Sequence, residues 1–231
     1  MKNIVVLTGA GMSAESGIAT FRDSGGLWNQ YKVEDVATPE GFRKNPELVL
    51  DFYNMRRKET LEAKPNAGHI GLAEMQEEYN VYVVTQNVDN LHENAGSKNV
   101  LHLHGELMKV QSTTDPGLVY ELTADNIEIN IGDKCEKGSQ LRPFIVWFGE
   151  AVPMMDKAVE VVRKADVVVV IGTSLNVYPA AGLLNYAAHG VPVYLIDPNE
   201  VKASRGGVHY IRKGASEGVK ELRELLKSEG F

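Results

Sequence analysis

The chain has 231 residues, a formal net charge of −7 and a single cysteine, Cys135. This length is sufficient for one large domain with its own hydrophobic core, so no disulfide or metal is needed for stability. The acidic balance argues against binding nucleic acid through broad phosphate contacts, and no apolar run reaches the length of a membrane span. The opening residues MKNIVVLTG resemble a core strand rather than a signal peptide, so we expect a cytoplasmic protein that binds neither nucleic acid nor membranes.

Short runs of valine and isoleucine recur along the chain and predict the strands of one sheet. They are NIVVLT at 3–8, VYVVT at 81–85, DVVVVIG at 166–172 and VPVYLID at 191–197. Continuous apolar runs, as opposed to alternating ones, are typical of parallel strands that are covered on both faces. We therefore expect an α/β protein with a Rossmann-like, doubly wound parallel sheet.

Helical patterns separate these strands, and two segments interrupt the rhythm. The helical patterns are PELVLDFYNMRRKETLEA, AGHIGLAEMQEEY, MDKAVEVVRKA, PAAGLLNYAAHG and SEGVKELRELLKSE. The interruptions, at about 31–66 and about 110–140, predict a small inserted lobe. The large lobe would then comprise about 1–30, 67–109 and 141–231 of a single domain that spans 1–231. Within the small lobe, NIEINI at 126–131 alternates as a half-buried strand does.

A glycine turn after the first strand gives the first nucleotide-binding signal. Residues 5–28 read VVLTGAGMSAESGIATFRDSGGLW, so Gly9 and Gly11 follow the strand, but Ala14 stands where a third glycine would complete the G-x-G-x-x-G fingerprint. Glycines in such a turn allow backbone N–H groups to approach a pyrophosphate at the start of a helix. The alternative is a plain strand-to-helix turn.

The last strand–helix–strand unit gives a second signal. Gly172, Thr173 and Ser174 follow one strand, and Asp197 ends the next. This is about the separation at which an acidic residue meets an adenosine ribose in Rossmann units. Alternatively, the two hydroxyl groups cap a helix and the carboxylate opens the turn DPN.

Candidate chemical groups lie in the middle of the chain. Gln86, Asn87 and Asp89 directly follow a strand, where the ligand crevice of an open α/β sheet lies, and they suit a carboxamide and ribose hydroxyls. In VLHLHGEL, His102 and His104 stand two residues apart, so they share one face of an extended segment. Three interpretations of this pair remain open: metal ligands, a catalytic base with its neighbour, or packed polar residues. The metal interpretation lacks a nearby third ligand.

Six motifs, in order along essentially the whole chain, resemble the sirtuins, a family of NAD-dependent protein deacylases. They are GAGMSAESGIATFR, TQNVDNLH, HLHGEL, LRPFIVWFGE, GTSLNVYPA and KGAS. The resemblance implies NAD as the cofactor and acyl-lysine proteins as partners, and we expect a monomer. It implies a cofactor site made of Gly9, Ala10, Gly11, Met12, Ala14, Phe21, Arg22, Gln86, Asn87, Asp89, Gly172, Thr173, Ser174, Asp197, Pro198, Asn199 and Ala215.

The family mechanism, carried over by this resemblance, makes His104 the general base and Asn87 a second catalytic residue. Nicotinamide leaves as the acyl oxygen attacks the ribose, and His104 removes the proton that frees the ribose 2′ oxygen to attack the acyl carbon. The products are lysine, nicotinamide and O-acyl-ADP-ribose, and a general base contributes about 10² to 10⁴ in rate. The resemblance places the extended substrate, by strand addition, between the TSLNVYP loop and Val146, Trp147, Phe148 and Gly149.

The sequence departs from the family pattern in the small lobe. Sirtuins usually carry two cysteine pairs there as a structural zinc site, whereas Ser112 stands where a first cysteine is expected and only Cys135 remains. No histidine occurs between Gly105 and Trp147, so zinc lacks four soft ligands. We therefore expect no metal and a lobe that closes by packing. Phe144, where a close motif has histidine, is a smaller departure.

A tyrosine and an arginine bear on the acyl group. Tyr53 and Arg56 in DFYNMRR are three residues apart on a predicted helix, so they project from one face. Alternatively, the tyrosine packs and the arginine pairs with a nearby acid. A Y-x-x-R pair in this lobe resembles the class III bacterial sirtuins that accept acidic acyl groups, where a guanidinium can bind a carboxylate through two hydrogen bonds. Small Ala37 leaves room for a longer acyl chain.

The resemblance thus implies an enzyme that removes succinyl and malonyl groups, and acetyl groups beside them. Two alternatives use the same nucleotide pocket. One is a mono-ADP-ribosyltransferase, and the other is a binding module for NAD or ADP-ribose without catalytic activity. The presence of His104 and of the strip from Trp147 to Glu150 disfavours the binding module.

Overall fold

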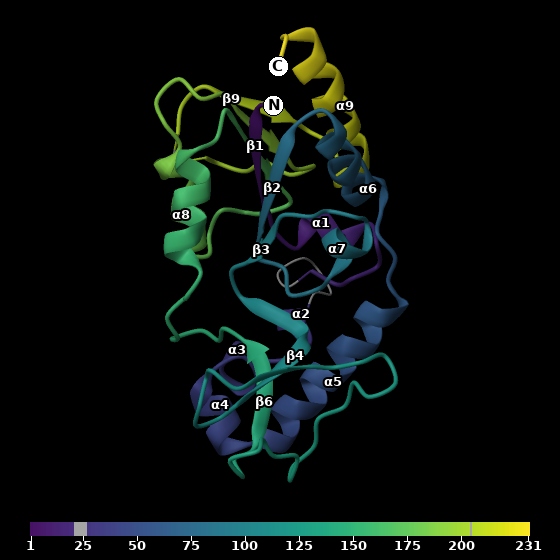
Figure 1. Ribbon diagram of the computed structural model, residues 1–231, viewed down its shortest axis with the longest axis vertical. Coiled ribbons are helices and arrows are strands. Elements are labelled where there is room, and N and C mark those ends of the chain that lie inside the picture. The colour runs from purple at the N-terminus through teal and green to yellow at the C-terminus, as the bar shows by residue number, and fades with distance from the viewer. Residues whose placement is uncertain (21–26, 204) are drawn as a thin grey trace.

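A computed structural model of the protein describes residues 1–20, 27–203 and 205–231. Within these residues, the large lobe contains a six-stranded parallel sheet (Figure 1). From one edge, its strands are β3 (Val100–His102), β2 (Asn80–Thr85), β1 (Asn3–Thr8), β7 (Val167–Ile171), β8 (Val193–Ile196) and β9 (Val208–Ile211). This is the order 3-2-1-4-5-6 of a Rossmann sheet, in which ligands bind where the strand order reverses. That point lies between β1 and β7.

Helices cover both faces of this sheet, which explains the continuous apolar runs. All five residues of β7 are buried. On one face lie α6 (Ala67–Glu74), the short helix η1 (Met75–Glu77) and α9 (Ala215–Ser228); on the other lie α8 (Met155–Arg163) and η2 (Ala180–Tyr186) (Figure 1). Two further one-turn helices, α1 (Gly11–Ala14) and α7 (Leu91–Asn94), follow β1 and β2. The predicted α/β fold and its doubly wound parallel sheet are confirmed.

The small lobe packs several short helices and one long helix against a second sheet. The helices are α2 (Leu27–Gln30), α3 (Val33–Val36), α4 (Pro39–Lys44) and α5 (Pro46–Glu62). The sheet is antiparallel, in the order β5 (Val119–Glu121), β4 (Gly105–Ser112), β6 (Leu141–Ile145). It therefore extends on both sides beyond the expected segment 110–140.

The long helix α5 begins where its sequence favours a start. The side chain of Asn45 accepts a hydrogen bond from the backbone N–H of Leu48 at 3.1 Å, and Pro46 occupies the first turn, where its missing N–H has no cost. One face of α5 then packs into the apolar cluster of the small lobe through Val49, Phe52 and Tyr53. This packing fixes the side chains that α5 presents to the space between the lobes.

Two local predictions differ from the structure. NIEINI at 126–131 is not a strand, because the amide of Asn54 takes the place of a partner strand: it donates to the carbonyl of Ile129 at 3.0 Å and accepts from its N–H at 2.9 Å. The segment PAAGLLNYAAHG forms the 3-10 helix η2, in which the N–H of Gly182 bonds to the carbonyl of Pro179 at 3.0 Å. Gly182 lowers the propensity for an α-helix at this point.

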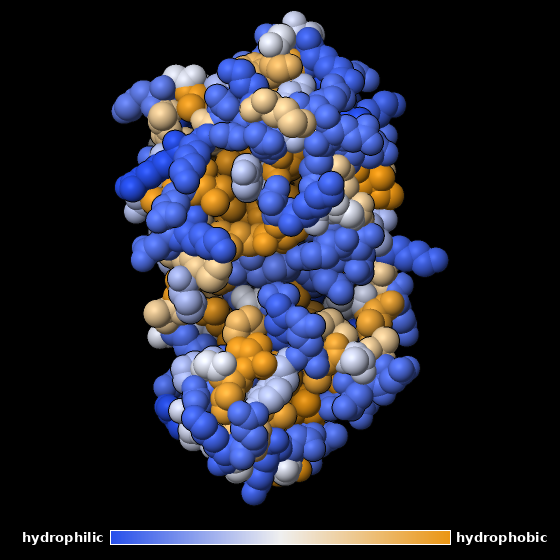
Figure 2. Space-filling view, viewed as in Figure 1, coloured by the Kyte–Doolittle hydropathy of each residue, from blue (hydrophilic) through white to orange (hydrophobic). Residues whose placement is uncertain are grey.

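On the face drawn in Figure 2, hydrophilic side chains cover much of both lobes, and apolar side chains are visible in the hollows between them. None of the helices in the described residues combines the length and the hydropathy that crossing a membrane requires.

Candidate active site

A cavity of about 600 Å³ is lined by residues of both lobes. The loops after β1, β2, β7 and β8 contribute from the large lobe, and α5 and the segment after β6 contribute from the small lobe. These loops follow the carboxyl ends of parallel strands on both sides of the point where the strand order reverses, which is where open α/β sheets bind ligands. The volume is that of a typical ligand pocket, about 300 to 1,000 Å³.

Most residues predicted for the cofactor and the substrate line this cavity. They are Gly9, Ala10, Gly11, Ala14, Ala37, Tyr53, Arg56, Gln86, Asn87, His104, Val146, Trp147, Phe148, Gly149, Gly172, Thr173, Ser174, Asp197, Pro198 and Asn199. Within the described residues, Met12, Asp89 and Ala215 are not part of its wall. Met12 and Ala215 pack in the core of the large lobe, and Gly214 takes the place of Ala215. Phe21 and Arg22 lie outside the described residues.

The glycines after β1 allow the loop after β1 to approach the loop after β7 closely. The N–H of Gly11 donates to the carbonyl of Gly172 at 2.9 Å, and the N–H of Gly9 donates to Ile171 at 3.0 Å. A Cβ on Gly9 would lie only 2.7 Å from the carbonyl oxygen of Gly172, whose own φ is +61°. These two N–H groups therefore join the loop after β1 to the end of β7 and the loop that follows it, and both glycines line the cavity.

Asn87 in the wall is connected to a buried hydroxyl and a buried carboxylate behind it. Asn87 donates from Nδ2 to the carbonyl of Gly9 at 3.0 Å and to Oγ of Ser13 at 3.1 Å, and Ser13 donates to Oδ2 of Asp89 at 3.0 Å. Burial raises the pKa of Asp89, although hydrogen bonds from Leu91 N–H and Ser13 oppose the rise. Asp89 thus supports the loop from behind, which explains why it does not reach the cavity.

His104 lies in the wall with one nitrogen already engaged. Its Nδ1 is 3.2 Å from the carbonyl oxygen of Gln86. Because a carbonyl can only accept, Nδ1 carries the proton, and Nε2 of the neutral ring keeps its lone pair. Burial lowers the pKa of His104, and the Gln86 carbonyl only partly opposes this. The side chain is therefore neutral near pH 7 and able to accept a proton at Nε2.

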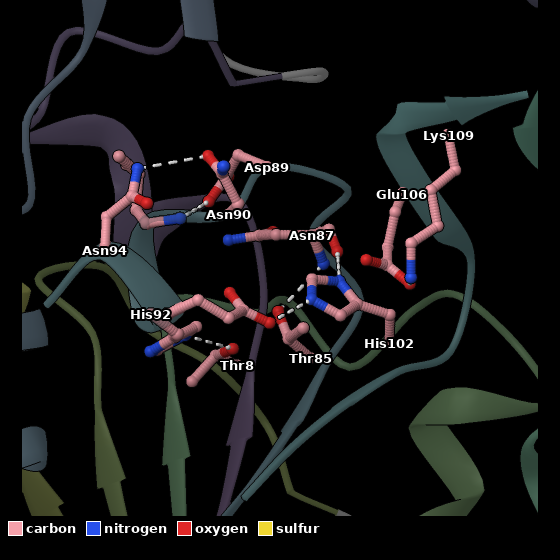
Figure 3. A network of polar contacts seen from close by, with 12 residues as sticks. Thr8, Thr85, Asn87, Asp89, Asn90, His92, Asn94, His102, Glu106 and Lys109 are labelled. Atoms are coloured by element: carbon pink, nitrogen blue, oxygen red, sulfur yellow. Dashed lines mark hydrogen bonds and ion pairs between the residues drawn. The ribbon is translucent and has the colours of Figure 1, made fainter. Parts of the chain in front are cut away.

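His102 has a different role from His104, although the sequence placed them on one strand face. β3 ends at His102, and a bend follows before His104. The His102 ring lies between Asn87, whose carbonyl is 3.0 Å from Nδ1, and Glu93, whose carboxylate is 2.8 Å from Nε2 (Figure 3). Burial lowers the pKa of His102, but the Glu93 carboxylate more than offsets this and raises it above its ordinary value.

The two histidines together hold the loop after β2. Their Nδ1 atoms bind the consecutive carbonyls of Gln86 and Asn87. Only His104 also reaches the cavity. Among the residues that the structure describes, no three His, Cys, Asp or Glu side chains gather as a metal site requires. The arrangement favours a base and a supporting neighbour over a pair of metal ligands.

Tyr53 and Arg56 both face the cavity from α5, as predicted from their spacing. Arg56 also forms the ion pair that the alternative interpretation foresaw, from Nη1 to the Glu59 carboxylate at 2.8 Å. The Arg56 side chain is only 5% exposed, whereas Glu59 is 41% exposed. Burial raises the pKa of Tyr53, so its hydroxyl group stays protonated.

Ser112 and Cys135, which mark the altered cysteine pattern, lie together in the small lobe. The thiol of Cys135 donates to Oγ of Ser112 at 3.4 Å. Ser112 in turn accepts from the backbone N–H groups of Thr114 and Asp115, each at 3.2 Å. The Ser112 hydroxyl group and the Cys135 thiol thus hold the turn after Ser112 against the turn at Cys135. The absence of zinc stays a prediction.

Some residues of the wall were not foreseen. They include Glu15, Phe52, Val88, Val152, Glu200 and Gly214. Glu15 belongs to the first motif, and its carboxylate accepts from the backbone N–H of Ser216 at 3.2 Å, which joins the loop after β1 to the start of α9. This contact spans almost the whole chain, so no local pattern announces it. Phe52 and Val88 stand beside predicted site residues, and that adjacency is the signal that would have found them.

Comparison with known proteins agrees with this geometry. A family model described as the Sir2 family matches residues 9–179. The chain belongs to the Sir2 family. One relative, named NAD-dependent protein deacylase, from Bacteroides thetaiotaomicron, is 62% identical over 230 residues, which cover 98% of each chain. Another of the same name, from Helicobacter pylori strain 26695, is 53% identical over 227 residues, again 98% of each chain.

Solved Sir2 structures share the fold. A crystal structure of a Sir2 homologue with NAD is 41% identical, with a TM-score of 0.88 over 99% of this chain and 90% of that one. A Sir2 structure with a p53 peptide and NAD+ is 30% identical, with a TM-score of 0.79 over 98% of this chain and 93% of that one. The two-lobed arrangement of this Sir2 protein is therefore the family arrangement.

Proposed function

We propose that this Sir2 protein is an NAD-dependent protein-lysine deacylase that removes succinyl and malonyl groups, and acetyl groups beside them. The observation that carries the proposal is the joint placement of Tyr53, Arg56 and His104 in the wall of one cavity. His104 supplies a base. The Arg56 guanidinium and the Tyr53 hydroxyl group suit the carboxylate at the end of an acidic acyl chain. The relatives named NAD-dependent protein deacylase support the general activity.

The residues present fit NAD as the cofactor. The two loops joined by Gly11 and Gly172 form one side of the cavity, and Asp197 lies 8% exposed at the end of β8, where a ribose is expected. Gln86 donates from its amide to Oγ1 of Thr173 at 3.1 Å, which joins the loop after β2 to the loop after β7. NAD supplies an electrophilic ribose carbon and, in nicotinamide, a leaving group.

The chain's own residues then bind, orient and move a proton. His104 accepts a proton at Nε2 because Nδ1 is committed to the Gln86 carbonyl. Asn87 holds the loop after β1 through its amide, and the substrate backbone lies along the segment from Val146 to Gly149. The protein acts as a cytoplasmic monomer, and O-acyl-ADP-ribose is one of its products.

The acyl preference is tested by kinetics on matched peptides. Arg56→Met and Tyr53→Phe should lower kcat/KM for succinyl-lysine much more than for acetyl-lysine, which has no carboxylate to bind. Loss of the buried Arg56 contact costs about 2 to 4 kcal/mol on the succinyl peptide. Equal losses on both peptides would mean that the pair supports the fold and does not read the acyl group.

Glu59→Gln is the matched control. It removes the ion pair with Arg56 but keeps the guanidinium at the cavity. If Arg56 acts only by bracing α5 through Glu59, this variant should reproduce Arg56→Met. If Arg56 binds the acyl carboxylate, Glu59→Gln should leave the succinyl-to-acetyl ratio of kcat/KM unchanged or increase it, since no competing carboxylate remains.

Mass spectrometry of a reaction with an acyl peptide and NAD separates the alternatives. A deacylase gives the free peptide and O-acyl-ADP-ribose. A mono-ADP-ribosyltransferase gives a protein or peptide heavier by one ADP-ribose. A binding module leaves every mass unchanged, which would contradict the proposal, and the presence of His104 in the wall argues against it.

A further inference from the structure

A hydrogen bond joins the segment after β6 to Tyr53 at the acyl end of the cavity. Nε1 of Trp147 donates to the hydroxyl oxygen of Tyr53 at 3.0 Å. Both side chains are buried, with exposed fractions of 2% and 5%, and both line the cavity. The bond connects α5 to the segment that follows β6, which come together only on folding.

The direction of this bond is fixed by chemistry. An indole N–H is a donor only, so the Tyr53 oxygen must be the acceptor. Its own O–H hydrogen is then directed to another group, and Tyr53 faces the cavity. Burial raises the pKa of Tyr53, so this hydrogen is retained at all working pH values. The tyrosine is thereby set as a donor toward whatever the cavity holds.

The indole itself is held firmly. The guanidinium carbon of Arg142 lies 3.5 Å from the centroid of the Trp147 ring. Arg142 is fixed in turn by two hydrogen bonds to the Glu150 carboxylate, at 2.7 and 3.1 Å, and the same carboxylate accepts from the backbone N–H of Trp147 at 2.8 Å. Phe42 packs near the ring, with centroids 5.3 Å apart. These contacts leave the indole N–H little freedom to turn away from Tyr53.

We propose that Trp147 is a positioning residue for acyl-group specificity: its indole N–H orients the Tyr53 hydroxyl group so that it donates to the terminal carboxylate of an acidic acyl chain. Arg142 and Glu150 hold the indole in place for this purpose. The inference rests on the proposed function, because it takes Tyr53 as a reader of the acyl group. It goes further by assigning acyl selectivity to a residue that never touches the carboxylate.

The test compares kcat/KM for succinyl-, acetyl- and pentanoyl-lysine peptides, the last being as long as succinyl but without a carboxylate. Trp147→Phe removes the N–H. Replacing Trp147 by 3-benzothienylalanine removes it with almost no change in ring size, which covers the case where the phenylalanine variant does not fold. Both variants should lower the succinyl-to-pentanoyl ratio of kcat/KM by about fivefold, as expected for one neutral hydrogen bond.

Two further variants separate positioning from a structural effect. Phe42→Leu loosens the packing of the Trp147 ring but keeps its N–H, so it should lower the succinyl-to-pentanoyl ratio less than Trp147→Phe does, even where it lowers kcat/KM for all three peptides. Tyr53→Phe should lower the succinyl-to-pentanoyl ratio by itself. In that background, Trp147→Phe should shift the ratio by less than about twofold, because two residues that act through one bond are not additive.

The outcomes are distinguishable. If Tyr53→Phe lowers the succinyl ratio but both Trp147 variants reduce all peptides equally, the positioning role is refuted and the proposed acyl preference stands. If Tyr53→Phe leaves the ratio unchanged, the acyl preference itself fails, and the role of Trp147 fails with it.

Discussion

The small lobe depends on one buried amide, and replacing Asn54 by alanine tests this. Asn54 lies on α5 and makes three hydrogen bonds: two to the backbone of Ile129, at 2.9 and 3.0 Å, and one from Nη1 of Arg57 at 2.7 Å. Ile129 is 5% exposed and Arg57 is fully buried. The substitution therefore leaves three buried polar groups without their partner.

The expected cost follows from these contacts. Each hydrogen bond contributes about 1 kcal/mol, and more when the orphaned group stays buried, so Asn54→Ala should lower the free energy of unfolding by about 3 to 4 kcal/mol. We expect a loss of free energy near the larger value because of Arg57. Burial already disfavours the charged guanidinium and lowers its pKa to about 10, and the alanine removes one of its hydrogen-bond acceptors.

Urea denaturation measures the effect, followed by circular dichroism and with a chelator present so that no metal contributes. Lys58→Ala is the matched control. Lys58 stands one turn further along α5 and pairs with Glu128 at 2.6 Å, so it joins the same two segments, but both side chains are about half exposed. It should hardly change the midpoint. Equal shifts for the two variants would refute the reasoning that the buried amide closes this lobe.

Three other outcomes are expected. His104→Ala should leave NAD binding, measured by calorimetry, nearly intact while turnover falls by about 100-fold or more, and near-normal turnover would remove His104 from the mechanism. The neutral ring of His104 is the base, and burial lowers its pKa below the ordinary value of 6.5. In a pH-rate profile, kcat/KM should therefore be constant above pH 6.5 and fall only as the pH drops through the lowered pKa of His104. An inflection above pH 6.5 would contradict this. The purified protein should contain no stoichiometric zinc by metal analysis and keep its fold in strong chelator, and one tightly bound zinc per chain would overturn that view.

The sheet could be predicted because its signal is local. β1 and β7 are continuous valine and isoleucine runs, and the structure buries all five residues of β7 between two helical layers. The strand order itself was not predicted, although glycine turns and polar residues mark the carboxyl ends of strands that meet at the cavity. The expected helix at Pro46–Glu62 likewise carries its own start signals.

The contact between α5 and the segment after β6 could not be predicted, because it joins residues far apart in sequence. Trp147 and Tyr53 are 94 positions apart. The sequence singles them out for separate reasons: Trp147 belongs to the segment expected to bind the substrate backbone, and Tyr53 belongs to the pair expected to bind the acyl group. Nothing in either motif states that one side chain orients the other. The 3.0 Å hydrogen bond between them supports the positioning role that we propose for Trp147, whereas the sequence suggests two independent contacts.

The wrong strand prediction at 126–131 and the unexpected contact of the glycine turn share one physical cause: a backbone group has a hydrogen-bond partner that periodicity does not represent. The alternation of 126–131 is real, but the amide of Asn54 bonds to Ile129 as a neighbouring strand would. The glycines after β1 do permit a close approach, but Gly11 gives its N–H to Gly172 of the loop after β7. A pattern shows that a backbone group needs a close partner, and only the folded chain shows whether this partner is a strand, a side chain, another loop or a ligand.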